Sequence, residues 1–245
     1  MQTFTTKSPI IKDIIKALEL SKDLFVSSIL IGEPHTGKKS LLKKIFPSIP
    51  IVSATNKELI HSTLKISDEI IITNFDILDN IKEYDFENKK IIATANKIKN
   101  KNLIDEMFAF IYHMPSLQER PEDIDILAKY YLDKAIKDLS IKEIDVDIDK
   151  ISIDLSNNTK TLKSSIYRYL IQKDMNIDEI KNALYEYLYN HLEGNNSYRE
   201  HIHIYEEPLI KAGLDKFSSQ LKLSSILGIN RNTLRKKIQE HNLDA

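Results

Sequence analysis

Short apolar runs recur through the first hundred residues of the chain. They are rich in isoleucine, polar stretches separate them, and they occupy residues 27–31, 49–52, 69–73 and 90–95. Runs of this length and composition are typical of strands that are buried on both faces of a parallel sheet. The chain is therefore expected to begin with a buried sheet.

Stretches with helical spacing precede and separate these runs. The apolar residues of segment 9–20 fall on one face of a predicted helix, at Ile10, Ile14, Ala17 and Leu18. A second helix is expected at residues 39–46. Because strands alternate with helices, the pattern indicates an α/β domain with a parallel sheet.

After Pro121 the strand pattern gives way to helices, which are expected at residues 122–139, 160–172, 176–194 and 206–217. Gly194 suits the C-terminal cap of the third of these helices, and Pro208 suits the first turn of the fourth. The third helix has an apolar face formed by Ile177, Ile180, Leu184 and Leu188. We expect an α/β domain at residues 1–120, a small helical subdomain at 121–173 and an all-helical domain at 174–245.

Residues 218–243 predict two helices joined by a tight turn. Gly228 can adopt the left-handed conformation that ends the first helix, and Asn230 is a good N-cap for the second. Ile229 is expected to fill the angle between the two helices. The predicted apolar positions are Leu221, Leu223, Leu227, Leu234 and Ile238. The second helix leaves Arg231, Asn232, Thr233, Arg235, Lys236 and Lys237 largely outward.

Positive charge is concentrated at this turn, although the 245-residue chain has a net charge of −1. Residues 216–237 carry six basic side chains and no acidic one. Local basic charge favours phosphate binding, and the second helix of a helix-turn-helix enters the major groove of DNA by its N-terminal end. Arg231 has the fork that reads guanine, and Asn230 and Thr233 would reach base edges and nearby phosphates. The alternative is an ordinary helical hairpin with a solvated basic face.

Residues 32–38 read Gly-Glu-Pro-His-Thr-Gly-Lys, and they follow a predicted strand and precede a predicted helix. The pattern fits a phosphate-binding loop, in which backbone N–H groups surround phosphates and the lysine, here Lys38, reaches the outer ones. Lys39 stands where Ser or Thr usually follows that lysine. A glycine-bearing turn without a ligand is the alternative.

This loop and its surroundings resemble the AAA+ domain of the NtrC family of bacterial enhancer-binding proteins. Segment 8–46 is similar to the start of that domain, segment 91–97 to its sensor strand, and segment 114–132 to the entry into its helical lid. The resemblance implies binding of ATP or ADP, with Asn96 sensing the γ-phosphate and Lys160 replacing the lid arginine. The implied nucleotide-binding residues are Gly32, Glu33, Pro34, His35, Thr36, Gly37, Lys38, Lys39, Ser40, Asn96 and Lys160.

Segment 206–243, which includes the sequence LGINRNTLRKK, resembles the Fis-type helix-turn-helix domain that ends NtrC-family proteins. Such domains dimerise through the two preceding helices, which would be residues 176–193 and 206–217 here. The family usually has Gly-Asn-Gln at the positions of Ser218, Ser219 and Gln220. The implied DNA-binding residues are Ser219, Gln220, Asn230, Arg231, Asn232, Thr233, Arg235, Lys236 and Lys237.

Several family features are missing. Hydrolysis needs carboxylates at the end of the third strand, where this chain has Asn74 and Phe75. Asp76 lies two residues beyond Asn74 and would reach a magnesium ion only if the register of the third strand shifted, so magnesium binding is doubtful. The first arginine is Arg120, so residues 1–119 hold no arginine finger. His35 replaces a loop glycine and would crowd a phosphate, and the family's sigma-factor loop, GAFTGA, has no counterpart. These departures imply a shortened, degenerate member of the family without ATP turnover.

The expected function is sequence-specific regulation of transcription by a homodimer that binds double-stranded DNA and, through its AAA+ part, a regulator or transcription-machinery partner. One alternative is an ATP-hydrolysing remodeller of a sigma-54 polymerase or another partner, and a second is a Fis-like architectural DNA-binding protein. Without cysteine, a signal peptide or an apolar run of membrane-spanning length, the chain is expected in the cytoplasm and away from membranes. The pair His201 and His203 lacks the neighbours of a metal site, so no metal is expected.

Overall fold

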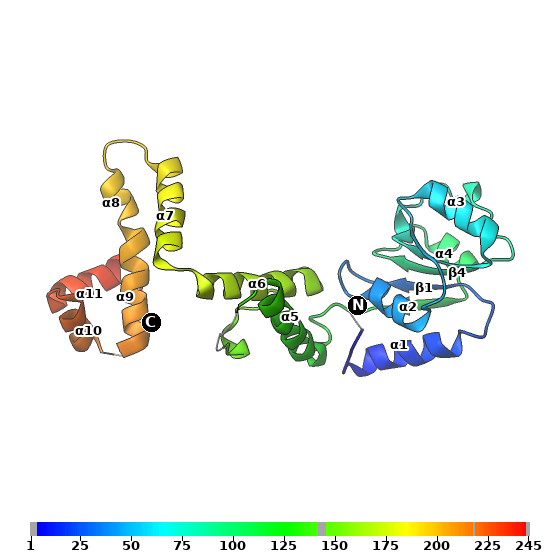
Figure 1. The fold of residues 1–245 in the computed structure, drawn as a ribbon, viewed down its shortest axis with the longest axis horizontal. Coiled ribbons are helices and arrows are strands. Elements are labelled where there is room, and N and C mark those ends of the chain that lie inside the picture. Colours follow the sequence, from blue (N-terminus) through cyan, green and yellow to red (C-terminus); the bar gives the residue numbers. More distant parts are fainter. Residues whose placement is uncertain (1–3, 142–145, 218, 244–245) are drawn as a thin grey trace. The chain divides into compact units, whose positions relative to one another are not determined.

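The computed structural model describes residues 4–141, 146–217 and 219–243. The chain divides into two compact units, residues 1–174 and residues 175–245. In Figure 1 the first unit runs from blue to yellow-green and the second from yellow to red.

The first unit contains a five-stranded sheet in the order β2-β3-β4-β1-β5, and every neighbouring pair is parallel. The strands are β1 Ser28–Ile31, β2 Ile51–Ser53, β3 Glu69–Thr73, β4 Lys90–Ala95 and β5 Phe110–His113. The predicted parallel sheet is confirmed. Strand β5 has no counterpart in the prediction, although residues 108–112 form an apolar run. It is an edge strand whose residues are exposed or half-buried.

Helices cover both faces of this sheet (Figure 1). They are α1 Pro9–Leu20, α2 Lys38–Ile45, α3 Lys57–Ile66 and α4 Lys101–Met107. Helices α1 and α2 share one core with Leu30, Ile71 and Ile92, whereas α3 and α4 pack against the opposite face of the sheet. The buried face of α1 contains Ile11 in place of the predicted Ile10, which is exposed. Because Ile10 and Ile11 are adjacent, helical spacing alone could not decide which of them faces the core.

The first unit ends in a two-helix subdomain formed by α5 Ile124–Asp138 and α6 Asn158–Asp174. Its separate core includes Leu127, Ala128, Leu162, Ile166 and Leu170. Among its described residues the unit also has four short 3₁₀ segments, at Phe75–Ile77, Ile81–Glu83, Pro121–Asp123 and Ile148–Lys150.

The second unit is helical. Its helices are α7 Ile177–His191, α8 Ser197–His201, α9 His203–Phe217, α10 Gln220–Leu227 and α11 Arg231–Glu240. A small core of Ile210, Leu223, Leu234 and Ile238 joins α9, α10 and α11.

Three local predictions for this unit were wrong. Helix α7 ends at His191, so Gly194 does not cap it. Helix α9 begins at His203, which places Pro208 inside the helix instead of in its first turn. Leu221 is exposed, whereas the prediction made it an apolar contact of α10. Helix propensity upstream of Pro208 therefore outweighed the cost of the single backbone hydrogen bond that proline removes.

Candidate functional site

The phosphate loop, residues 32–38, connects β1 to α2 at the carboxyl end of the sheet. Gly37 adopts φ 99°, a left-handed conformation that side chains rarely adopt. A Cβ atom at Gly37 would also lie 3.0 Å from the Phe4 ring. The turn leaves α2 with its N-terminus at the loop, where unpaired backbone N–H groups favour an anion.

Lys38 lies under this loop and is buried. Its Nζ donates hydrogen bonds to the carbonyl oxygens of Gly32 and Glu33, each at 2.6 Å, and to Asn96 Oδ1 at 3.2 Å. Burial lowers the pKa of Lys38 to about 8, although the carboxylates of Asp76 and Glu33 oppose this shift. The ammonium is thus oriented toward the loop, and its charge is less hydrated than that of a surface lysine.

A hollow of about 550 Å³, here called the phosphate hollow, lies above Lys38. It is lined by Pro34, His35, Thr36, Gly37, Lys38, Lys39, Ser40, Ser53, Thr73, Asn74, Thr94, Asn96 and Thr159. The structure therefore brings eight of the eleven predicted nucleotide-binding residues together. Gly32, Glu33 and Lys160 do not line the hollow, and Thr159 takes the place expected for Lys160.

The first residues of α6 form hydrogen bonds with the phosphate loop. Asn158 Nδ2 donates to Glu33 Oε2 at 2.9 Å and to the Pro34 carbonyl at 3.1 Å. Thr159 donates to the carbonyl of His35 from its backbone N–H, at 3.3 Å, and from its hydroxyl, at 2.6 Å. His35 adopts φ 60° with an exposed side chain, so its role in this loop is a backbone contact with the two-helix subdomain.

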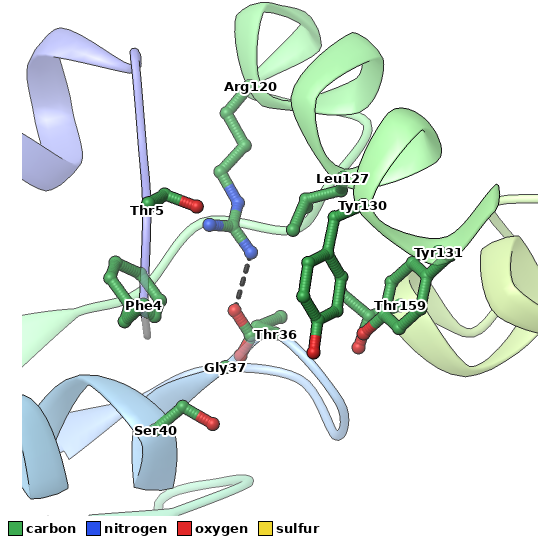
Figure 2. A pocket seen from close by; sticks show the side chains of 10 residues that line it. All are labelled: Phe4, Thr5, Thr36, Gly37, Ser40, Arg120, Leu127, Tyr130, Tyr131 and Thr159. Atoms are coloured by element: carbon green, nitrogen blue, oxygen red, sulfur yellow. Dashed lines mark hydrogen bonds between the residues drawn. The ribbon is translucent and has the colours of Figure 1, made fainter. Parts of the chain in front are cut away.

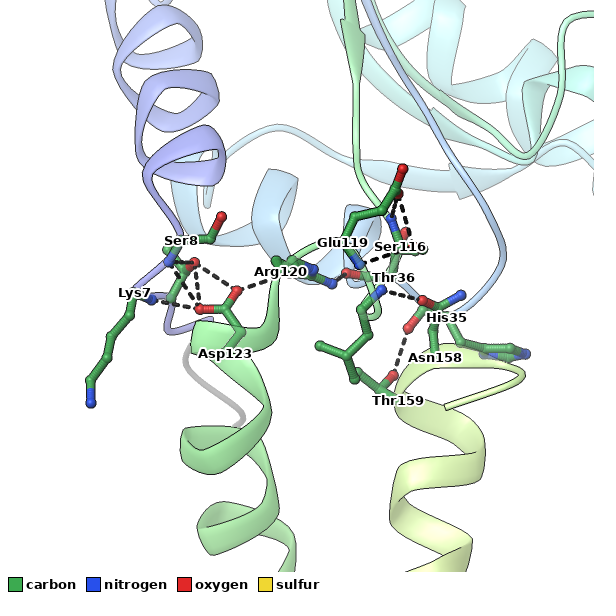
Figure 3. A network of polar contacts seen from close by, with 12 residues as sticks. Lys7, Ser8, His35, Thr36, Ser116, Glu119, Arg120, Asp123, Asn158 and Thr159 are labelled. Atoms are coloured by element: carbon green, nitrogen blue, oxygen red, sulfur yellow. Dashed lines mark hydrogen bonds and ion pairs between the residues drawn. The ribbon is translucent and has the colours of Figure 1, made fainter. Parts of the chain in front are cut away.

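A buried ion pair also joins the loop to the two-helix subdomain (Figure 3). Arg120, only 2% exposed, donates from Nη2 to the Thr36 carbonyl at 2.5 Å and from Nη1 to Asp123 Oδ2 at 3.3 Å. Burial lowers the pKa of Arg120, while the charge of Asp123 opposes that shift. Local spacing could not predict this contact, because Arg120 and Thr36 lie 84 residues apart.

Asp123 extends this network to the N-terminal strap, residues 4–8. Its carboxylate accepts from the backbone N–H groups of Lys7, at 2.6 Å, and Ser8, at 3.2 Å. The Thr6 hydroxyl donates to the same carboxylate at 2.8 Å. The first turn of α1 has no acidic residue of its own, so Asp123 supplies the negative charge that a helix N-terminus favours.

A second, smaller cavity of about 80 Å³ lies beside Thr36 and Gly37 (Figure 2). We call it the aromatic cavity, because Phe4 of the strap and Tyr130 and Tyr131 of α5 line it. Arg120, Ser40 and Thr159 also belong to its lining, and the last two are shared with the phosphate hollow. A ligand with a flat ring and a phosphate tail would fit these two adjoining spaces.

The end of β3 holds no carboxylate that faces the hollow. Asn74 lines the hollow, and Phe75 is buried in the core, where its ring packs edge-on against Phe108. Asp76 accepts a hydrogen bond from the Asn96 backbone N–H at 3.1 Å, and it lines a different hollow beside Asp79. The register shift that would bring Asp76 to the phosphate hollow is therefore absent.

In the second unit, the turn before α11 has the predicted local geometry. Gly228 is left-handed, with φ 65°, and Asn230 Oδ1 accepts from the Asn232 backbone N–H at 2.8 Å. Leu234 and Ile238 are buried. On the opposite side of α11 the side chains of Arg231, Asn232, Thr233, Arg235 and Lys236 are exposed.

The two arginines of α11 are free of carboxylates. Within residues 4–141, 146–217 and 219–243, neither Arg231 nor Arg235 makes a side-chain hydrogen bond or ion pair. Lys236 makes only an exposed contact of 3.6 Å with Glu240.

Lys237 was predicted to point outward, and this is wrong. Its Nζ lies 2.5 Å from Glu206 Oε1, and the hydrogen bond from Lys237 lowers the pKa of Glu206. His241 Nε2 lies 3.7 Å from the other oxygen of Glu206. This cluster packs α11 against α9, so Lys237 has a structural contact.

The remaining predicted DNA-contacting residues lie around the start of α10. Ser219 is its N-cap, with Oγ accepting from the Lys222 backbone N–H at 3.4 Å, and Gln220 is half-buried. Ser218 lies outside the described residues.

Comparison with solved structures identifies the fold of the first unit. The crystal structure of NtrX from Brucella abortus in complex with ATP matches with a TM-score of 0.56 and 13% sequence identity, over 98% of this chain and 69% of that one. NtrX from Brucella abortus in complex with ADP matches with a TM-score of 0.53 and 13% identity, over 98% and 70%. The fold is that of AAA+ P-loop ATPases. No protein-family model and no curated protein matches the sequence.

The part of the chain that the structure describes has no clustered metal ligands. It contains no group of three or more histidine, aspartate or glutamate side chains arranged for a metal ion. His201 Nε2 contacts the His191 carbonyl at 3.1 Å, and His203 begins α9, so neither belongs to such a group. None of the described helices combines the length and the apolar character needed to cross a membrane.

Proposed function

We propose that the chain is a sequence-specific DNA-binding regulator of transcription that acts as a homodimer and holds a nucleotide in its AAA+ unit. The observation that carries this proposal is the exposed face of α11, on which Arg231 and Arg235 have no carboxylate partner among the described residues. Exposed guanidinium groups without an acidic partner are available to contact phosphates and guanine.

The position of these residues on α11 favours readout of bases. Arg231, Asn232 and Thr233 form the first turn, and this end of a recognition helix reaches furthest into the major groove. Arg235 and Lys236 follow one turn later, where they would contact the flanking phosphates. Lys237 is no longer proposed as a free phosphate contact, because Glu206 holds it. The resemblance of segment 206–243 to Fis-type domains supports the same assignment.

An unpartnered apolar surface on the second unit supports the homodimer. Ile177 and Ile180 of α7 are 70% and 54% exposed, and no residue of α7 is buried. A groove of about 360 Å³ between α7, α8 and α9 is lined by Leu184, Leu188, Leu192, Ser197, Tyr198, His201, Ile202, Ile204 and Tyr205. Contiguous exposed apolar surfaces often mark sites of protein interaction. In a homodimer with twofold symmetry, the same apolar surface of a second copy of the chain would cover this one.

Nucleotide binding is supported by the two adjoining spaces of the first unit. The phosphate hollow offers Lys38, Lys39 and the N-terminus of α2 to an anion, and the aromatic cavity offers the rings of Phe4 and Tyr130 to a base. NtrX, which has the same fold, was crystallised with ATP and with ADP.

ATP turnover is not part of the proposal. Asn74 lines the hollow and Phe75 is buried, so neither end-of-strand position supplies a carboxylate to hold Mg²⁺ or to activate the attacking water. The competing function, an ATP-hydrolysing remodeller, predicts robust phosphate release that Lys38→Ala abolishes. We expect no phosphate release above the background of Lys38→Ala.

The DNA-binding part is tested by titrating fluorescent duplexes with the full chain at several salt concentrations. We expect binding to survive excess competitor DNA and to weaken steeply with salt, since phosphate contacts displace counterions. Binding that ordinary competitor DNA removes completely would favour the architectural alternative. The absence of binding at low salt would overturn the proposal.

A further inference from the structure

The phosphate hollow has an unusual set of polar groups for an AAA+ unit. Its lining contains cationic lysines at positions 38 and 39 and the amides of Asn74 and Asn96. Hydroxyl groups make up most of the remainder, from Thr36, Ser40, Ser53, Thr73, Thr94 and Thr159. Among the described residues that line it, none carries a carboxylate. The hollow is therefore a site for anions with no anionic ligand of its own to offer a metal ion.

Magnesium needs such ligands. Mg²⁺ is a small, hard ion, and proteins usually hold it through one or two carboxylates together with the phosphates of the substrate. P-loop ATPases supply the hydroxyl after the loop lysine and an acid at the end of a neighbouring strand. Here Lys39 and Asn74 occupy these two positions. An ammonium repels a divalent cation, and an amide oxygen is a weaker ligand than a carboxylate. The residues present do not fit magnesium.

The two nearest acids are engaged elsewhere. Asp76 accepts the backbone N–H of Asn96 at 3.1 Å and lines a separate hollow. Glu33 accepts from Asn158 Nδ2 at 2.9 Å, which is one of the contacts that fix the loop to α6. Either carboxylate would have to give up its hydrogen bond before it could reach a metal beside the phosphates.

Part of the charge of a polyphosphate is offset without a metal. Lys38 and Lys39 provide two positive charges, and the N-terminus of α2 points its free N–H groups at the same space. The first turn of α2 contains no acidic residue that would oppose this field. We propose that the site takes the nucleotide as the metal-free polyanion, so that binding is independent of magnesium. This inference rests on the nucleotide binding proposed above.

The test measures the affinity of the full chain for ADP and for ATP by calorimetry, in excess magnesium chloride and in excess EDTA. We expect the affinities measured in EDTA to be no more than about twofold weaker than those measured in magnesium. A loss of about tenfold or more in EDTA would overturn the inference while nucleotide binding itself would stand. If nucleotide binds in neither condition, the nucleotide site and the inference both fail.

A variant that restores the missing carboxylate should make nucleotide binding depend on magnesium. Asn74 has φ 57°, a conformation that aspartate tolerates as well as asparagine does, so Asn74→Asp should fold and place a carboxylate in the hollow. We expect EDTA to weaken nucleotide binding by this variant about tenfold or more. If Asn74→Asp binds nucleotide equally well in magnesium and in EDTA, the missing carboxylate does not explain why wild-type binding is independent of magnesium. That result would also overturn the inference.

Two variants of α2 serve as controls. Lys38→Ala should abolish binding both with and without magnesium. Lys43→Ala removes the same charge from an exposed position that does not line the hollow, and it should bind as the wild type does.

Discussion

At the scale of single residues, burial determines what the charged side chains can do. Lys38 is buried and bonded to three oxygen atoms, whereas Arg231 is exposed and unpaired within the described chain. A buried ammonium is costly to keep charged, so it favours an anion that restores the lost hydration. An exposed guanidinium loses its hydration only when a partner arrives, which suits recognition of DNA.

The pKa of Lys38, lowered to about 8 by burial, predicts how nucleotide affinity depends on pH. Bound phosphates favour the charged form and raise this pKa, so binding above pH 8 requires uptake of a proton. Affinity should be near its maximum at about pH 7 and should fall by up to about tenfold per pH unit above pH 8. Calorimetry at pH 9 in buffers of different ionisation enthalpy should reveal the proton uptake. Affinity that stays level to pH 9 would contradict this assignment.

The role of Arg231 predicts a loss of specific DNA binding. Arg231→Ala should weaken binding to a preferred duplex by about 1 to 3 kcal/mol, because a guanidinium that reads a base is lost. Arg199→Ala is the matched control, since it removes an exposed arginine of the same unit from α8. Fluorescence anisotropy of the two variants should separate them. Equal losses would mean that only net charge matters.

At the scale of elements, one buried ion pair holds three segments together. Arg120 contacts the phosphate loop, and its partner Asp123 contacts the strap before α1. The loop, the strap and the two-helix subdomain therefore share one polar network (Figure 3).

Removing Asp123 should destabilise the first unit strongly. Asp123→Ala leaves Arg120 charged and buried without its partner, and breaking such a pair typically costs about 3 to 5 kcal/mol of unfolding free energy. Glu122→Ala removes an exposed acid from the same turn and should cost under about 0.5 kcal/mol. Urea denaturation followed by circular dichroism compares the two. Similar midpoints for both variants would refute the structural role of the pair.

The sequence predicted elements well where hydrophobic burial decides the structure. Strands β3 and β4 begin and end at the predicted residues, since their isoleucine runs are buried on both faces. Edge strand β5 was missed, although its first three residues are apolar. The contacts of Arg120 with Thr36 and of Asp123 with Lys7 could not be predicted, because local spacing carries no information about partners 84 and 116 residues away. For the same reason, local spacing could not predict that Thr159, and not Lys160, lines the phosphate hollow.

At the scale of the whole molecule, a unit with the fold of AAA+ P-loop ATPases is followed by a helical unit with an exposed apolar face. That face predicts that the chain is a dimer in solution. Ile180→Asp places a charge on the exposed apolar side of α7 and should shift the chain to the monomer in sedimentation analysis. Asn182→Asp adds the same charge to a neighbouring exposed position and should leave the dimer intact. A wild-type monomer at micromolar concentration would contradict the proposed interface.

Selection of duplexes from a random-sequence library by the full chain tests the central claim most directly. The account predicts enrichment of one defined sequence with twofold symmetry, and loss of preference at specific positions when Arg231→Ala is used for the selection. Recovery of unenriched random sequence, or an identical preferred sequence with and without Arg231, would contradict the claim that α11 reads DNA.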